Sequence, residues 1–159
     1  MTTGETVFIQ PQPREGEVYE RFNWDAPIIV SPHKPSRLYF ASQRVWKSDD
    51  RGDSWNPISK DLTRNQERFD LPIMGSKQSW DNPWDVLAMS NYNTISAISE
   101  SPVREGLIYA GTDDGFINVT DNDGKRWKKF EVKRLPGAPE YAYVNDLKAC
   151  LLYTSPSPR

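Results

Sequence analysis

Short β-prone runs alternate with turns along the middle of the chain, and the same order of runs occurs twice. The first set lies at residues 28–31, 38–41, 45–48 and 55–58, and residues 96–130 carry the counterparts. Runs of this length, bounded by Gly, Pro, Asp and Ser, are typical of strands and not of long helices. The pattern predicts two successive units, each with four antiparallel strands.

The two units align throughout, apart from a two-residue insertion in one turn. Matched pairs include Ser31 with Ser101, Tyr39 with Tyr109, Ala41 with Gly111, Val45 with Ile117, and Trp55 with Trp127. A repeated unit of four antiparallel strands is the sequence pattern of a β-propeller blade. The fold is therefore predicted to be all-β: a fragment of a β-propeller with about two four-stranded blades and partial flanking blades.

Each unit carries the same kind of octapeptide between its third and fourth runs. Residues 48–55 and 120–127 both fit S/T-x-D/N-x-G-x-x-W, the pattern called an Asp box. In such a turn the third side chain accepts backbone N–H bonds, and the glycine adopts a positive φ. A structural role, and not a catalytic one, is expected for Ser48, Asp50, Gly52, Trp55, Thr120, Asn122, Gly124 and Trp127.

The remaining segments are divided around these units. Residues 1–25 are interpreted as the end of a preceding blade with its connecting loop, and residues 136–149 as the start of the next blade. The two Asp-box blades span residues 26–58 and 93–135, with an insertion at 59–92 between them. Connections of this length are usually functional or disordered, and residues 61–68 within it have the composition of a short helical turn.

The last ten residues, 150–159, resemble the in-frame translation of a transposase-type sequencing adapter. A natural Ser/Pro-rich tail is the alternative. The single cysteine of the chain, Cys150, lies in this segment. The rest of the chain is thus expected to need neither disulfide nor thiolate chemistry.

The overall composition excludes two classes of partner. The chain has 159 residues, of which 36% are hydrophobic and 26% charged, and its net charge is −2 with neither sign gathered into a block. A phosphate backbone or a polybasic membrane surface would need a basic stripe, and no apolar stretch approaches the ~18 residues of a membrane span. We expect no nucleic-acid partner and no membrane insertion.

Four residues are candidates for ligand binding. Asp25 and Asp146 each precede or open an innermost strand, so both can project into the central funnel where propellers bind ligands; alternatively they bond to neighbouring backbone groups. Trp80 and Trp84, in the insertion, offer an aromatic platform for sugar or peptide. Capping of an apolar blade edge is the alternative for the two indoles.

Motifs for catalysis or metal binding are weak. His33 is the single histidine and has no His or Cys companion, so neither a His-based triad nor a zinc site is indicated. Asp113-Asp114-Gly115 is interpreted as a hairpin turn, with a metal role as the alternative. A sialidase would carry an Arg-Ile-Pro tripeptide, which the sequence lacks. No catalytic residue, metal or cofactor is predicted.

Several stretches resemble a known family. Residues 22–33, 48–55, 109–115 and 143–148 are similar to large bacterial proteins with sortilin-type, Asp-box (BNR-repeat) β-propellers. Members are often labelled glycosyl hydrolases from the repeats alone, and they are usually exported. The resemblance implies a piece of a longer protein that is extracytoplasmic (periplasmic, cell-surface or secreted), and it assigns no catalytic residue.

The favoured function is a non-catalytic propeller that binds peptide, protein or glycan, with the remaining blades of the same chain as structural partners. The alternative is a propeller glycoside hydrolase, which needs two carboxylates facing each other across the substrate. An assembly factor of the photosystem type is a third hypothesis, which a funnel lined with arginine would favour. A propeller site is assembled from several blades, so residues 1–149 hold only part of it under each hypothesis.

Overall fold

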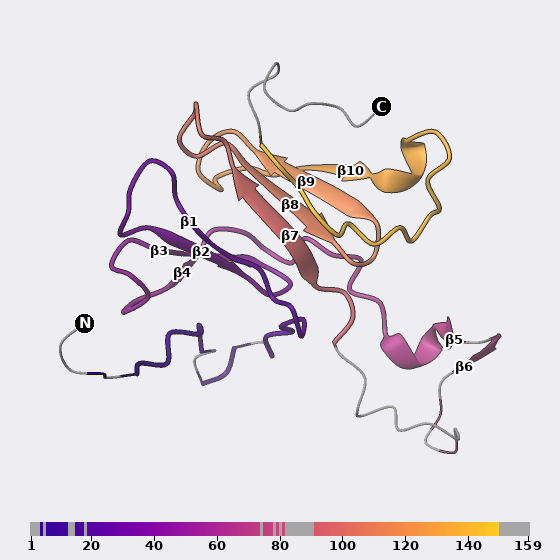
Figure 1. Cartoon of the computed structure of the whole chain (residues 1–159). Coiled ribbons are helices and arrows are strands. Elements are labelled where there is room, and N and C mark those ends of the chain that lie inside the picture. The colour runs from indigo at the N-terminus through magenta and orange to yellow at the C-terminus, as the bar shows by residue number, and fades with distance from the viewer. Residues whose placement is uncertain are drawn as a thin grey trace.

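The chain is all-β and contains two four-stranded antiparallel sheets that lie side by side (Figure 1). The structure is a computed structural model that describes residues 4, 6–12, 15–17, 19–73, 75–77, 79, 81 and 91–149. The first sheet consists of β1 (Ile28–Val30), β2 (Leu38–Ala41), β3 (Val45–Ser48) and β4 (Asn56–Pro57). The second consists of β7 (Ile95–Glu100), β8 (Ile108–Thr112), β9 (Phe116–Thr120) and β10 (Lys128–Glu131).

Each sheet is a simple meander, because every strand pairs with its neighbour in sequence. The predicted runs at 38–41 and 45–48 coincide with β2 and β3, and the runs at 28–31 and 55–58 contain β1 and β4. The prediction of two units of four antiparallel strands is therefore confirmed. The two sheets do not close into a ring.

The apolar core lies between the sheets. Alternation along β2 turns Tyr39 and Ala41 to one face, where they are fully buried against the second sheet. Val45 and Leu62 belong to the same cluster, as do Ile95, Ile98, Ile108 and Ala110. Burial of one such Val, Ile or Leu side chain stabilises the fold by roughly 1.5–3 kcal/mol, so this cluster is the main attraction between the sheets.

Polar contacts fix the register of the two sheets. The Tyr39 hydroxyl donates to Glu100 Oε1 at 3.1 Å, and Lys47 Nζ lies 2.6 Å from Asp123 Oδ2. Arg37 NH1 lies 2.5 Å from Glu105 Oε1. Because Glu100 is itself buried, its alignment with the hydroxyl matters more than that of a solvated pair.

The two Asp-box turns have the same hydrogen bonds. In the first, Gly52 N donates to Ser48 Oγ at 2.8 Å and Ser54 N donates to Asp50 Oδ1 at 2.9 Å. In the second, Gly124 N donates to Thr120 Oγ1 at 3.0 Å and Arg126 N donates to Asn122 Oδ1 at 2.9 Å. Gly52 and Gly124 have φ values of 97° and 83°, in the left-handed region predicted from the spacing.

Each Asp box also contacts the segment that precedes its own sheet. Trp127 Nε1 donates to the carbonyl of Ile58 at 3.0 Å, and Trp55 Nε1 donates to the carbonyl of Ile9 at 2.7 Å. The glycines lie on the same two isoleucines, since a Cβ at Gly124 would be 2.5 Å from the Ile58 oxygen and one at Gly52 would be 2.9 Å from Ile9 Cβ. Ile9 therefore occupies the same position relative to the first sheet as Ile58 occupies relative to the second.

The segment after β10 packs on the second sheet much as the second sheet packs on the first. It begins with the 3-10 helix η3 (Val132–Arg134), and residues 138–147 then cover Ala97 and Ile117 of the second sheet. Val144 N donates to the Thr112 carbonyl at 3.1 Å, whereas Ile95 N donates to the Ser42 carbonyl at 2.8 Å. Residues 142–149 thus begin to cover the second sheet as β7 covers the first.

The segments around the two sheets contain little regular structure. The described residues of 6–10 and 143–149 form no strand, although they hold the positions just given. Residues 61–67 form no helix, and the 3-10 helix η1 (Arg68–Asp70) begins only where that run ends. A short hairpin, β5 (Pro72–Ile73) with β6 (Ser76–Lys77), follows and was not predicted. Whether such a segment forms a strand depends on backbone pairing with a neighbouring strand, which residue composition does not reveal.

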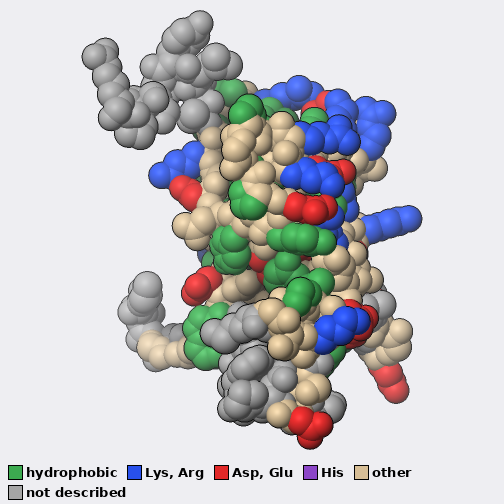
Figure 2. Space-filling model, turned by 90° about the vertical axis from the view of Figure 1, so that its right-hand side faces the viewer, with side chains coloured by type: hydrophobic (Ala, Val, Ile, Leu, Met, Phe, Trp, Pro, Cys, Tyr) green, Lys and Arg blue, Asp and Glu red, His purple; other side chains and the backbone are tan. Residues whose placement is uncertain are grey.

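Figure 2 shows the side of the molecule that carries η3 and the β5–β6 hairpin. Lys and Arg side chains gather in the upper part of this face, and hydrophobic side chains gather in its middle. No helix in the described part of the chain has the length and apolar character that crossing a bilayer requires.

Replacement of Asn122 by alanine should lower the free energy of unfolding by about 1 kcal/mol, because the Arg126 amide loses its acceptor within the turn. Asn122→Asp is the matched control, since the first turn uses Asp50 at this position and keeps the same acceptor. Urea titration of both variants measures the effect. Equal loss in Asn122→Asp and Asn122→Ala would contradict the role given to this oxygen.

Candidate functional site

Asp25 and Asp146 are the two candidate ligand residues within the described part of the chain, and each has its own local contact. Asp25 is exposed two residues after Asn23, whose side chain Oδ1 accepts from Asp25 N at 3.2 Å. Asp146 is also exposed, and its Oδ2 lies 3.6 Å from Lys148 Nζ. No hydrogen bond or ion pair within the described residues joins the two carboxylates. Trp80 and Trp84 lie outside the described residues.

Tyr143, three residues before Asp146, is half exposed. Burial raises the pKa of its phenol, and the charges of Asp113 and Asp25 add to that shift. The prediction that Asp25 and Asp146 contact a ligand stays a prediction.

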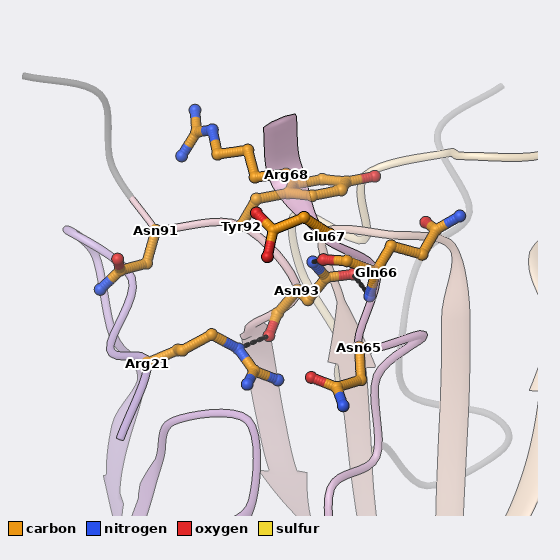
Figure 3. A pocket seen from close by; sticks show the side chains of 8 residues that line it. All are labelled: Arg21, Asn65, Gln66, Glu67, Arg68, Asn91, Tyr92 and Asn93. Atoms are coloured by element: carbon orange, nitrogen blue, oxygen red, sulfur yellow. Dashed lines mark hydrogen bonds between the residues drawn. The ribbon is translucent and has the colours of Figure 1, made fainter. Parts of the chain in front are cut away.

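A polar cavity opens where three segments of the chain meet (Figure 3). It has a volume of about 370 Å³ and is lined by Arg21, Asn65, Gln66, Glu67, Arg68, Asn91, Tyr92 and Asn93. Arg21 comes from the segment before β1, residues 65–68 precede and open η1, and residues 91–93 lead into β7. The cavity thus lies at the two ends of the predicted insertion.

Asn93 holds these three segments together. Its side chain pairs with the backbone of Gln66 in both directions, with Asn93 Nδ2 donating to Gln66 O at 2.8 Å and Asn93 Oδ1 accepting from Gln66 N at 3.2 Å. Its own carbonyl accepts from Arg21 Nε at 3.2 Å. The side chain is 2% exposed and the backbone is left-handed, with φ of 60°. Asn is one of the few residues that tolerates this conformation, so Asn93 is a positioning residue.

The cavity offers neutral donors and acceptors together with charged groups. Asn65, Gln66 and Asn91 contribute amides that can both donate and accept hydrogen bonds. Gln66 Oε1 is buried and has no hydrogen-bond partner among the described residues. Arg21 NH2 lies 2.6 Å from Asp61 Oδ2, so much of its charge is balanced. Glu67 Oε1 accepts from Phe69 N at 3.3 Å.

Tyr92 remains protonated across the physiological range. Burial raises the pKa of its phenol to about 12, and the nearby charges of Asp114 and Asp113 contribute. A neutral phenol presents an O–H donor and an aromatic face on the same side chain. Burial also lowers the pKa of Arg68, which lies beside Tyr92 (Figure 3).

An apolar cavity of about 500 Å³ adjoins the polar one. Leu71, Pro72 and Tyr141 line it together with Tyr92 and Arg68, which also line the polar cavity. The guanidinium of Arg64 lies 4.7 Å from the centre of the Tyr141 ring and 4.5 Å from that of Phe116. This cation–π contact orients Tyr141 at the wall of the cavity.

The β8–β9 turn carries two buried aspartates that contact residues next to the cavity lining. Asp113 accepts from Thr94 N at 2.9 Å and from Thr94 Oγ1 at 2.7 Å. Asp114 accepts from Arg64 N at 2.6 Å and from Thr112 Oγ1 at 2.5 Å. Every carboxylate oxygen therefore already has a protein donor. Burial raises the pKa of Asp113 to about 6 and also raises that of Asp114.

The interpretation of residues 113–115 as a hairpin turn is confirmed, since they connect β8 to β9 and Gly115 has φ of 90°. In the described part of the chain, no group of three or more His, Cys, Asp or Glu side chains is placed to hold a metal ion.

Sequence reasoning missed most of this site. The cavity residues at 65–68 meet those at 91–93 only in the folded chain, so no local sequence pattern predicts this contact. Asn91-Tyr92-Asn93 did carry a usable signal, because amides flank an aromatic residue directly before a predicted inner strand, as Asn23 and Trp24 do in the first unit. Neither a protein-family model nor a curated protein sequence matches this chain.

Proposed function

We propose that the chain is a non-catalytic, ligand-binding segment of a β-propeller in a larger exported bacterial protein, and that its ligand binds in the joined polar and apolar cavities. The carrying observation is that Tyr92 and Arg68 line both cavities. A ligand with a hydrogen-bonding part and an apolar part, such as a peptide or a glycan, fits this division.

The propeller part of the proposal is supported by equivalent stacking at successive positions. The Trp127 contact with Ile58 is repeated by Trp55 with Ile9, and the Ile95 contact with Ser42 is repeated by Val144 with Thr112. Units that stack through the same contacts build an array in which each unit needs its neighbours. A propeller is the array expected for four-stranded meanders.

Glycoside hydrolysis is the rival, and the carboxylates argue against it. Among the described residues that line the polar cavity, Glu67 is the single carboxylate, whereas the reaction requires an opposed pair. Asp113 and Asp114 are buried, and each oxygen accepts a hydrogen bond from the protein. They are placed to position the β8–β9 turn and residues 64 and 94.

Tyr92→Ala should weaken ligand binding by at least about tenfold, because it removes the aromatic surface common to both cavities. The full chain is screened against arrays of oligosaccharides and of extended peptides, and the first hit is titrated against each variant. Phe8→Ala is the control, since the Phe8 side chain is 75% exposed and lies beside Ile9, at the Asp box.

Two results would contradict the proposal. One is unchanged affinity in Tyr92→Ala with the fold intact, which would move the site elsewhere, with Asp25→Asn and Trp84→Ala as the next variants. The other is release of reducing sugar from an array glycan that stops in Glu67→Gln, because that would assign catalysis to the cavity. Asp50→Ala should leave affinity unchanged, since this residue contacts only its own turn among the hydrogen bonds described.

A further inference from the structure

The Asp-box turn makes the same two contacts wherever it meets a neighbouring segment. Its tryptophan donates from Nε1 to a backbone carbonyl, at Ile58 for Trp127 and at Ile9 for Trp55. Its glycine lies flat on the side chain of that same isoleucine, at Ile58 for Gly124 and at Ile9 for Gly52. The receiving position therefore offers a carbonyl oxygen to the indole and an apolar side chain to the glycine at one residue.

Phe130 is the third position of this kind in the chain. The repeat alignment ends with Ile58 matched to Phe130. The backbone agrees, because Ile58 N donates to the Val45 carbonyl, and Phe130 pairs with Ile117, the match of Val45. Yet the Phe130 side chain is 53% exposed, whereas Ile58 is packed against the core cluster between the sheets.

The surface around Phe130 is covered on its inner side only. Val144 and Leu147 lie over Gly111 as β7 lies over the first sheet. On the first sheet, the outer side is then covered by β8 and by the second Asp box, which contacts Ile58 and Lys47. At the matched positions of the second sheet, Phe130 and Val119, no Asp box is in contact within the described residues.

We propose that Phe130, with Val119 beside it, is a docking position for a third Asp-box turn: a Gly-x-x-Trp segment that presents a bare glycine and an indole N–H. The proposal is independent of the ligand bound in the cavities. The residue before the glycine of this partner is expected to be uncharged or basic. Asp123 at that place pairs with Lys47, and the second sheet has Val119 where the first has Lys47.

The test uses a peptide of residues 116–131, which carries the Asp box of the second sheet in its hairpin and is closed by an added terminal disulfide. We expect saturable binding to the isotope-labelled full chain, with the largest chemical-shift changes at residues 117–119 and 128–131. The Asp123→Asn peptide should bind more tightly than the unmodified one, because Asp123 would otherwise be buried without Lys47 opposite.

Matched variants separate this contact from unspecific adhesion. A Trp127→Phe peptide should bind about fivefold more weakly, the factor of one hydrogen bond. Phe130→Asp in the full chain should abolish binding, and Phe130→Ala, the milder change, should weaken it about tenfold. Val103→Asp, at a 64% exposed valine between β7 and β8, should have no effect.

Three outcomes would overturn the proposal. The first is no binding of the closed peptide at millimolar concentration, and the second is binding that persists in both Phe130 variants. The third is shift changes confined to the surroundings of Ile9 or Ile58, because the peptide would then displace the existing Asp boxes and leave Phe130 unoccupied.

Discussion

Trp127→Ala should lower the free energy of unfolding by about 3 kcal/mol, the largest loss that we expect from a single Asp-box residue. The indole packs against the core cluster between the sheets, and its Nε1 donates to the Ile58 carbonyl at 3.0 Å. Alanine would leave a cavity at the junction and an unpaired carbonyl beside it. Both effects act on the contact that joins the two sheets, so we expect loss of cooperativity as well as of stability.

Two variants give this result its meaning. Trp127→Phe keeps most of the packing and removes the hydrogen bond, and should cost about 1 kcal/mol. Trp24→Ala removes an indole that is 89% exposed, and should change stability by less than about 0.5 kcal/mol. Urea titrations followed by circular dichroism measure all three. A loss in Trp127→Ala no larger than in Trp24→Ala would show that the tryptophan does not join the sheets.

The strands could be predicted because each is defined by its local sequence. Two turns, Ser48 to Trp55 and Thr120 to Trp127, reverse the chain through short-range hydrogen bonds. The runs on both sides of each turn are thereby brought together as antiparallel strands. Repetition then confirms the register, since an error in one unit would not recur in the other. Strand identity in this chain is largely a property of sequences of ten residues or fewer.

The segments that flank the two sheets could not be predicted, because their structure depends on contacts that are distant in the sequence. Residues 6–10 and 143–149 have β-prone composition, but a strand requires a partner that offers a row of backbone groups. Val144 N finds only the Thr112 carbonyl, and Ala149 N finds the hydroxyl of Ser99. Their composition indicates an extended chain, but it does not show which backbone groups the chain pairs with.

The cavities were the least predictable part. Asn93 pairs with Gln66 across the whole insertion, and Arg21 reaches the Asn93 carbonyl from the segment before β1. Sequence reasoning placed ligand contact at Asp25, Asp146, Trp80 and Trp84, choosing aromatic and acidic residues by their position relative to inner strands. The same criterion, a position directly before an inner strand, also selects Tyr92, which precedes β7, but no sequence rule says that residues 65–68 return to it.

The wild-type chain should lose stability as the pH rises from about 4 to about 7, and Asp113→Asn should remove the part of this loss that Asp113 contributes. Burial raises the pKa of Asp113 to about 6 in the folded state, from an ordinary value of 3.8. The folded chain therefore binds a proton more tightly than the unfolded chain. The contribution is fully present below the unfolded pKa, and it is lost as the pH rises through the folded pKa. Its size is about 3 kcal/mol.

Asparagine keeps the geometry at this position without the charge. Its Oδ1 can accept from Thr94 N, and its amide can donate to Thr94 Oγ1, the atoms that contact Asp113 now. Urea titrations at pH 4 and pH 7 should thus show the Asp113→Asn variant gaining about 3 kcal/mol relative to wild type at the higher pH. The opposite shift at Asp50, whose pKa is lowered to about 2 by hydrogen bonds from Ser54 and Ser48, acts below this window. If the variant and the wild type differed equally at both pH values, the Asp113 carboxylate would be titrating as a solvated group, and burial in the β8–β9 turn would not be setting its proton affinity.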